Sequence, residues 1–486
     1  MAGAPSSTRR AWAAGAVASV SQFVYMFDAG IVALSLPEIQ ATFPGTSRTT
    51  MGWVAGIFLI AQASFLLVGG RLGDRRGRKV VFLSGLSLFC VGGALTAVAP
   101  DIWFLLAARA AQGVGAALLT SGALALVLPM FAPSMAPKVV AAWGMVGASA
   151  ALISPTLGGL IVERSWRWGF AATLPLGVLA VVAGRRLLVE TERESHTGRL
   201  DRASLLLAPP ALGVLMLVLS RGRSWGWGSP LTIGLGTAAI AVIVALVRRS
   251  AQATDPLLDL RIFRHRGFNA FSSSGVLQQM GFFSWWLTTP IVGRELWGWS
   301  VAEIGVALAV TQVMALIGSP LAAWLVNKAG QTAPVVVGLA LITVSLTWLT
   351  TTTTPGSDYW VAYAPMVVPF GLGCAMAGTV LSGGALAALP EELLGAGNSY
   401  VQLTRRLGGA AGVALGLALL GEAEGTAIAA GAQRAWTFSV VVHAAALVPL
   451  AASRWWPQRL GAGGRRLGAR QSKSRTPRMF SPSRIA

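Results

Sequence analysis

The sequence predicts an all-α membrane protein with fourteen transmembrane helices. Three observations support this fold class: the composition is 54% hydrophobic and only 12% charged, long apolar runs recur along the chain, and basic residues collect in alternate loops. A soluble protein carries about 25% charged residues, and a membrane-spanning helix needs about 20 apolar residues. The composition therefore excludes an ordinary soluble fold.

Fourteen apolar runs meet or approach the length of a membrane span. In chain order they cover 11–36, 52–70, 80–99, 103–128, 138–162, 168–184, 205–219, 229–248, 268–293, 302–326, 333–352, 360–388, 397–421 and 434–453. The run at 205–219 is the weakest, because it is short and contains two adjacent prolines. We expect each run to form one helix that crosses the membrane.

The basic residues predict an orientation for these spans. If the N-terminus is cytoplasmic, the loops on that side hold 28 Lys and Arg residues and the outer loops hold 7. Cytoplasmic loops of membrane proteins carry such an excess, so we expect both termini in the cytoplasm and the protein in the inner membrane. The net charge of +20 then needs no nucleic-acid partner, because the arginines lie between apolar runs and not on an amphipathic reading surface.

A weak internal repeat divides the chain into two halves. GRLGDRRGRK (Gly70–Lys79) shares its pattern with LVNKAG (Leu325–Gly330), and eight spans separate the copies. This fits two six-helix halves with an inserted helix pair. We therefore divide the chain into an N-terminal half (1–184), a linker with two extra helices (185–267), a C-terminal half (268–453) and a basic tail (454–486). The tail lacks an apolar face and is expected to be disordered; it helps to fix the topology, and contact with anionic lipid headgroups is the alternative.

Asp28 is the one acidic residue well inside an apolar run, VYMFDAGIVALSLPEI (Val24–Ile39). The other acidic residues fall in loops or near the ends of runs. A charged group at the centre of a bilayer costs about 2.5–3.5 kcal/mol on insertion scales, and desolvation favours the protonated form of a carboxyl group. We expect Asp28 to load and release protons. A neutral, hydrogen-bonded aspartate that only ties helices together is the alternative.

Arg109 is the matching buried cation, and Gln112 follows it about one helical turn later. A buried guanidinium must be paired or hydrogen-bonded. From the residues alone two roles stay open for Arg109. It pairs with an acid, or it is a structural residue that donates to backbone carbonyls.

Six motifs, taken in chain order, resemble the major facilitator superfamily and in particular its 14-helix drug:proton antiporter branch. They are FDAGIVALSLPEI (Phe27–Ile39), GRLGDRRGRK (Gly70–Lys79), LAARAAQGVGAA (Leu106–Ala117), GASAALISPTLGG (Gly147–Gly159), DPLLDLRIFRHRGF (Asp255–Phe268) and RRLGGAAGVAL (Arg405–Leu415). The resemblance implies the major facilitator fold and exchange of a small organic compound for protons by alternating access. Two residues depart from the pattern: Ser154 stands where the antiporter motif usually has glycine, and Asn327 stands where the second loop copy would have an acid.

The resemblance also implies roles for three groups of residues. The proton-coupling pair is Asp28 and Arg109. The conformational latch consists of Gly70, Asp74, Arg75, Gly77 and Arg78. It holds the two halves in the outward-facing state, partly through a carboxylate at a helix N-terminus. The antiporter motif consists of Gly147, Ser154, Pro155, Gly158 and Gly159. Its small residues allow a close helix contact that prevents proton leak. Topology alone would explain the latch arginines, but not the acid and the glycines beside them.

Polar and aromatic residues inside the apolar runs are candidates for a substrate cavity, because such sites are mostly apolar with a few polar groups. Ordinary packing is the alternative for each of them. The candidates are Tyr25, Gln112, Trp143, Gln279, Gln312 and Arg405. Since Asp28 is the sole buried acid while Arg109, Arg405 and Arg406 are basic, we expect a neutral, zwitterionic or anionic cargo and not a lipophilic cation.

Several other functions are excluded or disfavoured by the sequence. No glycine-rich loop is followed by Lys and Ser or Thr, so an ATP-driven pump is not expected. Cys90 and Cys374 lie in apolar runs and predict neither a disulfide framework nor a metal site. The acids and histidines are too few and too scattered for a membrane-embedded enzyme, and no cofactor is expected.

The expected function is export of an antibiotic or related metabolite by a monomeric transporter. Only 4 of the 38 basic residues are lysine, which is typical of a GC-rich genome such as that of an actinomycete. A cephamycin-type β-lactam is one cargo that the resemblance suggests. A broad multidrug pump and a membrane sensor without transport activity are the alternatives.

Overall fold

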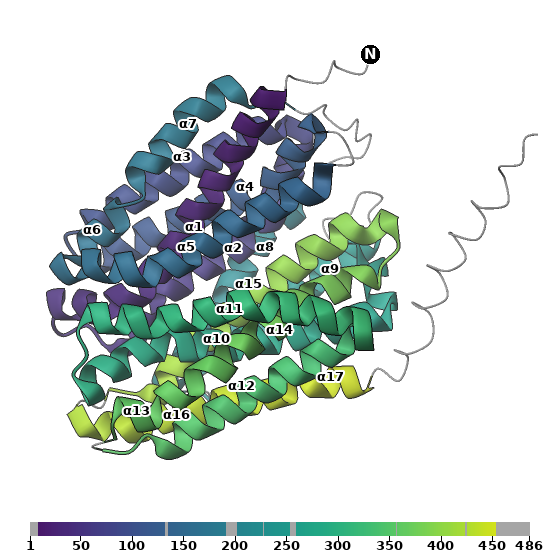
Figure 1. Cartoon of the computed structure of the whole chain (residues 1–486). Helices are drawn as coiled ribbons and strands as arrows, with labels where there is room; N and C mark the ends of the chain where they lie inside the picture. Colours follow the sequence, from purple (N-terminus) through teal and green to yellow (C-terminus); the bar gives the residue numbers. More distant parts are fainter. Residues whose placement is uncertain are drawn as a thin grey trace, which may run out of the picture.

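The computed structural model describes residues 8–131, 135–190, 202–226, 228–252, 259–355, 357–422 and 425–452. Within these ranges the chain forms helices and no strand, and the long helices run side by side in two bundles (Figure 1). The predicted all-α class is therefore confirmed. The predicted basic tail, 454–486, lies outside the described residues.

The first bundle is drawn in purple and blue in Figure 1 and runs from α1 to α7. It contains α1 (Thr8–Thr42), α2 (Arg48–Arg76), α3 (Arg78–Ala97), α4 (Ile102–Val127), the 3-10 turn η1 (Leu128–Met130), α5 (Ala136–Arg164), α6 (Trp166–Ala171) and α7 (Leu174–Leu187). α6 and α7 together form one span. A carboxylate caps α4: Asp101 accepts hydrogen bonds from the backbone N–H groups of Trp103 and Phe104, at 2.8 and 2.9 Å.

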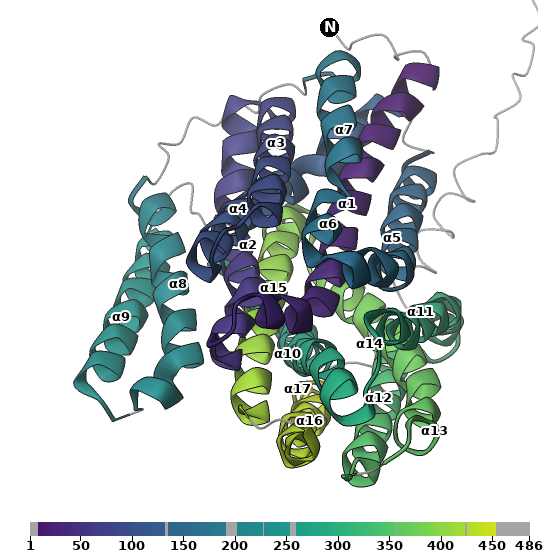
Figure 2. The same cartoon turned by 90° about the vertical axis from the view of Figure 1, so that its left-hand side faces the viewer.

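The inserted helix pair consists of α8 (Arg202–Trp225) and α9 (Pro230–Gln252). The two helices pack against each other to one side of the bundles (Figure 2), and α8 also contacts α2 and α15 (Leu394–Leu420). α8 is the weakest predicted span, yet it forms a helix of 24 residues with Pro209 and Pro210 inside it. At one end, Arg221 of α8 donates a hydrogen bond of 3.2 Å to the Thr50 hydroxyl of α2.

The second bundle is drawn in green to yellow in Figure 1 and runs from η3 to α17. It contains η3 (Leu260–Arg264), α10 (Arg266–Trp297), α11 (Val301–Ala329), α12 (Thr332–Thr352), α13 (Tyr359–Ala362), α14 (Ala364–Ala387), η4 (Glu391–Leu393), α15, η5 (Gly425–Ala427), α16 (Ile428–Ala445) and α17 (Leu447–Ala452). α13 with α14, and α16 with α17, each form one span. The last predicted span was placed at 434–453, and α16 begins six residues before that start.

Fourteen long helices or helix pairs occupy the positions of the predicted spans in the described part of the chain. In the described ranges, 12 helices or helix pairs are long and apolar enough to cross a membrane. The other two spans are α8, whose apolar core is only Leu206–Leu215, and α10. α10 has 32 residues, well above the about 20 that a span needs, but its serines and glutamines reduce its hydropathy.

The two loop copies have a similar local geometry. Gly77 follows α2 with φ +106°, and Gly330 follows α11 with φ +81°. Each N–H group donates to the carbonyl four residues earlier, Gly77 to Gly73 at 3.0 Å and Gly330 to Val326 at 2.9 Å. Side chains other than glycine rarely adopt this positive φ, so both copies need glycine at this position.

Ion pairs and close helix contacts join the two bundles at one end of the molecule. Arg48 of α2 lies 3.6 Å from Glu295 of α10, and Arg294 of α10 lies 3.1 Å from Glu38 of α1. At the same end α2 packs on α15 and α5 packs on α11. We call this end, where α1 finishes and α2 begins, the Arg48 end. The opposite end, where α2 finishes and α3 begins, is the Gly77 end.

Candidate functional site

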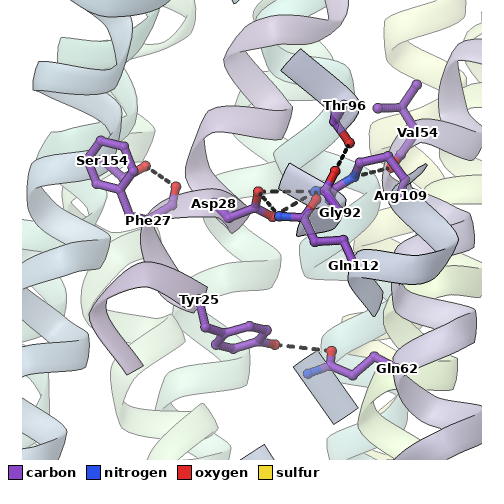
Figure 3. Close-up of polar contacts among 10 residues, drawn as sticks. All are labelled: Tyr25, Phe27, Asp28, Val54, Gln62, Gly92, Thr96, Arg109, Gln112 and Ser154. Carbon is purple, nitrogen blue, oxygen red and sulfur yellow. Dashed lines mark hydrogen bonds and ion pairs between the residues drawn. The ribbon is translucent and has the colours of Figure 1, made fainter. Parts of the chain in front are cut away.

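Asp28 lies in the interior of the first bundle and is held by two side chains from α4 (Figure 3). Arg109 Nη1 donates to both carboxylate oxygens, at 3.1 and 2.9 Å. Gln112 Nε2 donates to Oδ1 at 2.9 Å, and Gln112 Oε1 accepts from Arg109 Nη1 at 2.6 Å. The three residues therefore form a closed triangle of charge-assisted hydrogen bonds. We call them the Asp28 cluster.

The Asp28 cluster is almost completely buried. Asp28 is 2% exposed, and Arg109 and Gln112 are each 1% exposed. No other carboxylate among the described side chains is buried to this degree. Each described acid apart from Asp28 lies in a loop or within about one turn of a helix end. A buried charge pair is tolerated when further hydrogen bonds accompany the ion pair. Here Arg109 Nε, Arg109 Nη1 and both Asp28 oxygens have hydrogen-bond partners.

The Arg109 guanidinium is fixed from three sides. Its Nε donates to the backbone carbonyl of Val54 on α2 at 3.1 Å. Its Cζ lies 4.4 Å from the centre of the Phe58 ring and 5.4 Å from that of Phe170. Arg109 thus pairs with an acid and also donates to a backbone carbonyl.

Glycine in α3 allows Gln112 to reach Asp28. A Cβ at Gly92 would lie 2.7–2.8 Å from the Gln112 Cβ, Cα and N atoms, so only glycine permits this approach of α3 to α4. From the sequence, Gln112 is a cavity candidate, separate from the predicted pair of Asp28 and Arg109. The structure brings Gln112 into the Asp28 cluster, a contact that one-turn spacing from Arg109 could have indicated.

Tyr25 connects the Asp28 cluster with the second bundle. Its hydroxyl donates to Gln62 Oε1 on α2 at 3.2 Å (Figure 3), and its ring stacks on Phe58 with centroids 6.3 Å apart. On the other side, Arg406 of α15 lies 5.2 Å from the centre of the Tyr25 ring. Gln62 was not identified from the sequence, although it is a lone amide inside the apolar run 52–70.

Arg405 and Gln279, both cavity candidates, meet inside the second bundle. Arg405 Nη2 donates to Gln279 Oε1 of α10 at 3.1 Å. Arg405 Nη1 donates to the Gly378 carbonyl at 3.1 Å and to Ser382 Oγ at 2.6 Å, both on α14. Ser382 was missed because an isolated serine in an apolar run carries no distinctive pattern. This second polar group, on α10, α14 and α15, is therefore made of one cation and neutral acceptors.

The other two cavity candidates lie apart from both polar groups. Trp143 lines an apolar pocket of about 430 Å³ between α1, α4, α5 and α7, together with Trp12 and Phe23. The indole Nε1 of Trp143 is buried and has no hydrogen-bond partner among the described residues. Gln312 is half-buried on α11 and has no hydrogen bond to either polar group in the described ranges.

The antiporter-motif residues of α5 face two different neighbours. Gly147 lies against Gln22 and Gly158 against Ile31, both on α1; a Cβ would come within 3.1 Å and 2.6 Å of these side chains. Ser154 Oγ donates to the Phe27 carbonyl at 2.7 Å, next to Asp28. Pro155 and Gly159 face α11 of the second bundle: a Cβ at Gly159 would lie 3.1 Å from the Val301 carbonyl oxygen.

The expected latch region lies at the Gly77 end. Lys79, in the first turn of α3, donates its backbone N–H to Glu190 Oε1 at 2.9 Å, so Glu190 occupies the N-terminus of α3. A Cβ at Gly77 would lie 2.5 Å from that carboxylate, whereas one at Gly70 would meet nothing within 4 Å. Arg75 and Arg78 are half-buried, and the Asp74 side chain lies outside the described part of the chain. Glu190 was missed, although it is the first acid after the sixth span.

Metal chemistry finds no support in the described residues. No three His, Cys, Asp or Glu side chains there are grouped closely enough to share a metal ion. Cys90 and Cys374 are both free thiols.

Comparison with known proteins gives one family and several relatives. The profile of the Major Facilitator Superfamily matches residues 18–413. The tetracenomycin C resistance and export protein of Streptomyces glaucescens is 29% identical over 84% of this chain and 75% of its own length. The puromycin resistance protein pur8 of Streptomyces alboniger is 30% identical over 84% of this chain and 81% of its own length. The multidrug transporter protein MdtP of Bacillus subtilis is 26% identical over 82% of this chain and 73% of its own length.

Solved structures share the fold at low sequence identity. An auto-inhibited peptide transporter of the POT family matches with a TM-score of 0.69 and 16% identity, over 92% of this chain and 97% of its own. The xylose transporter XylE from E. coli, in an inward-open conformation, matches with a TM-score of 0.64 and 15% identity, over 94% and 99%.

Proposed function

Because the chain belongs to the Major Facilitator Superfamily, we propose that it is a proton-coupled antiporter that exports a small organic compound across the cytoplasmic membrane. Members of this family carry small molecules through the membrane, so the chain is a transporter and not an enzyme. The finer assignment, to antiport and to export of an antibiotic or related metabolite, rests on the Asp28 cluster and on the named activities of the relatives.

The observation that supports proton coupling is the isolation of Asp28. It is the one buried carboxylate among the described side chains, and its only charged partner there is Arg109, at 2.9 Å. A carboxylate inside the membrane region is costly and is by default a functional group. It can take up a proton without a new partner, because Gln112 offers both an amide donor and a carbonyl acceptor next to it.

The Asp28 cluster supplies a physical link between protonation and conformation. While Asp28 is ionised, the charges of Asp28 and Arg109 compensate each other. Once a proton from water binds to a carboxylate oxygen, Arg109 becomes a buried cation without an anionic partner, and such a charge is strongly unfavourable. The protonated protein therefore favours a second arrangement in which Arg109 is hydrated or paired again. Antiport follows if cargo and proton favour opposite arrangements.

The direction of transport rests on the distribution of basic residues. With 28 basic residues on one side and 7 on the other, the Gly77 end is cytoplasmic and the Arg48 end is outside. The Arg48–Glu295 and Arg294–Glu38 ion pairs then close the protein on its outer side. Cargo enters from the cytoplasm in this arrangement and leaves after the Arg48 end opens.

The cargo assignment draws on the relatives, of which one exports tetracenomycin C and another confers puromycin resistance by their names. We infer an antibiotic or related metabolite, with a cephamycin-type β-lactam as a specific candidate. A broad multidrug pump is the second candidate, supported by the relative named a multidrug transporter. A membrane sensor without transport activity is distinguished from both by the experiment below.

Proton movement in proteoliposomes tests this function. A pH-sensitive dye inside the vesicles reports proton flux when tetracenomycin C, puromycin and a panel of β-lactams are added in turn. We expect at least one compound to move protons through the wild type, none to do so through Asp28→Asn, and Asp358→Asn to behave as wild type. Asp358 is the matched control because it is exposed and its side chain makes no capping hydrogen bond. Equal flux through Asp28→Asn, or no flux with any compound, would contradict the proposal.

A further inference from the structure

Two adjacent arginines, Arg405 and Arg406, lie near the middle of α15, far from any acid of the second bundle. They are 11 and 12 residues beyond the start of this 27-residue helix. The acids of that bundle whose side chains are described all lie in loops or near helix ends: Asp259, Glu295, Glu303, Asp358, Glu392 and Glu422. The centre of the second bundle thus carries two positive charges from α15 and no negative charge among its described residues.

The partners of these arginines are neutral. Arg405 donates to a carbonyl, a hydroxyl and an amide oxygen. Arg406 contacts the face of the Tyr25 ring, and among the described residues neither guanidinium has an ion pair. By contrast, Arg109 in the first bundle has both an acid and an amide as partners. A guanidinium inside a membrane protein without an anionic partner is unfavourable unless something else supplies the charge.

The position of the pair suits a ligand that enters between the two bundles. Arg405 and Arg406 are both half-buried, so each keeps part of its surface open. Gly378, whose carbonyl accepts from Arg405, has open space beside it, because a Cβ there would meet nothing within 4 Å. Arg406 reaches across to Tyr25 of the first bundle, and Tyr25 stacks on Phe58. Arg406 therefore adjoins an aromatic surface that belongs to the opposite half, and Arg405 is its neighbour in the chain.

We propose that Arg405 and Arg406 bind the carboxylate of an organic anion, whose apolar body lies against Tyr25. Guanidinium groups bind carboxylates through parallel N–H···O bonds with a geometry that lysine cannot reproduce. Arg405 is held in place by its three neutral acceptors, while Arg406 has no hydrogen bond among the described residues and is free to turn toward the ligand. The cargo thus supplies the missing negative charge.

A carboxylate cargo also agrees with the energetics of export. The inference rests on the proposed function only for the direction of movement. In a cell whose interior is negative, an anion that leaves in exchange for an entering proton moves two charges in the favourable direction, so both the pH gradient and the membrane potential drive export. A cationic cargo would gain nothing from the potential in a one-to-one exchange.

Binding measurements in nanodiscs test the site without requiring proton flux. The probes are benzylpenicillin, 1-naphthylacetate and fluorescein, each compared with its own methyl ester by isothermal titration. The wild type is expected to bind at least one acid about tenfold more tightly than its ester. Arg406→Gln should lose that preference by weakening acid binding alone, and Arg406→Lys should keep part of it. Arg264→Gln, which changes an exposed arginine of the second bundle, should keep all of it.

Two outcomes overturn the inference: equal affinity of the wild type for acids and esters, or an equal loss of both in Arg406→Gln. The result is independent of the antiport test. Selective acid binding without proton movement would disprove the proposed antiport and support the carboxylate site. Proton movement with only neutral or cationic compounds would support antiport and disprove the carboxylate site. Arg405→Gln is compared by thermal unfolding first, because its three hydrogen bonds also join α10, α14 and α15.

Discussion

At the scale of single residues, the protein concentrates its buried charge in one triangle. Asp28, Arg109 and Gln112 exchange four hydrogen bonds of 2.6–3.1 Å, and Val54 contributes a backbone acceptor. Removing one partner of a buried ion pair costs about 3–5 kcal/mol, while replacing both partners is often nearly neutral. The stability of variants therefore reports directly on whether the pair exists.

Arg109→Gln is expected to lower the free energy of unfolding by about 3–5 kcal/mol, because Asp28 is left buried without a cation. Asp28→Asn combined with Arg109→Gln should recover most of that loss. Thermal unfolding of the purified variants measures both effects, with Arg264→Gln as the exposed control. Additive losses in the double variant would show that the two side chains are not energetically coupled.

Ser154 takes the place of the usual glycine of the antiporter motif, and its hydroxyl supplies a contact that glycine lacks. It is fully buried and donates to the Phe27 carbonyl at 2.7 Å. Ser154→Ala should lower the free energy of unfolding by about 1 kcal/mol, the net value of one hydrogen bond. Ser149→Ala is the matched control on the same helix, since Ser149 is exposed and bonds only within its own helix turn. An equal effect of the two variants in thermal unfolding would contradict this assignment.

At the scale of helices, small residues determine how closely α5 and α11 approach. Gly159 and Gly305 lie at this contact, and a Cβ at Gly305 would meet the Pro155 carbonyl oxygen. The α5–α11 contact belongs to the closed Arg48 end, so its strength affects the balance between open and closed arrangements. A close helix contact of this kind depends on glycine because the backbones themselves touch.

Gly305→Ala is expected to destabilise the closed Arg48 end by about 1–3 kcal/mol, the usual cost of overpacking. Substrate transport should fall about tenfold, because one of the two alternating arrangements is disfavoured. Gly234→Ala on α9 serves as the control, since a Cβ there meets nothing within 4 Å. Initial rates of substrate efflux from loaded vesicles measure the effect. Normal rates in Gly305→Ala would show that this contact does not limit transport.

Much of the helix content was predictable because a span leaves a simple signal, a long apolar run between polar segments. The correspondence of Gly77 and Gly330 was also predictable, because both copies of the repeated loop have glycine at this position. Asp28 and Arg109 were found because a charge in an apolar run is costly and therefore conspicuous.

The contacts of uncharged residues were not predictable to the same degree. Gln112 and Gln62 are single amides whose partners lie on other helices, and helix packing decides which face they share. Glu190 lies just beyond its helix, and its place at the start of α3 depends on how the ends of α3 and α7 meet. Tertiary packing supplies this information, and residue spacing along one chain does not contain it.

At the scale of the whole molecule, the two bundles are joined at the Arg48 end through five charged residues. Arg48 is 2% exposed and approaches Glu295; its backbone N–H donates to Glu422 at 2.9 Å, and its guanidinium donates to the Gly421 carbonyl at 3.3 Å. Arg294 and Glu38 add a second pair. These contacts connect α1 and α2 with α10 and the segment after α15. They must break whenever the Arg48 end opens.

Combined Arg48→Gln and Glu295→Gln substitutions are expected to shift the protein toward opening at the Arg48 end. Spin labels at Ala41 and Asp358, and separately at Val80 and Lys328, report the two ends in a background without Cys90 and Cys374. The first distance should lengthen and the second should shorten, because alternating access moves the ends in opposite senses. Pulsed electron–electron double resonance measures both distances. Unchanged distances would contradict the role of these contacts in closing the Arg48 end.

The central claim, that Asp28 carries the coupled proton, is tested most directly by comparing two transport modes of Asp28→Asn. Exchange of labelled for unlabelled substrate across a vesicle membrane needs no net proton movement, whereas uphill accumulation driven by a pH gradient does. The account predicts that Asp28→Asn keeps exchange and loses proton-driven accumulation, while the wild type performs both. Accumulation by Asp28→Asn at the wild-type level would contradict the account.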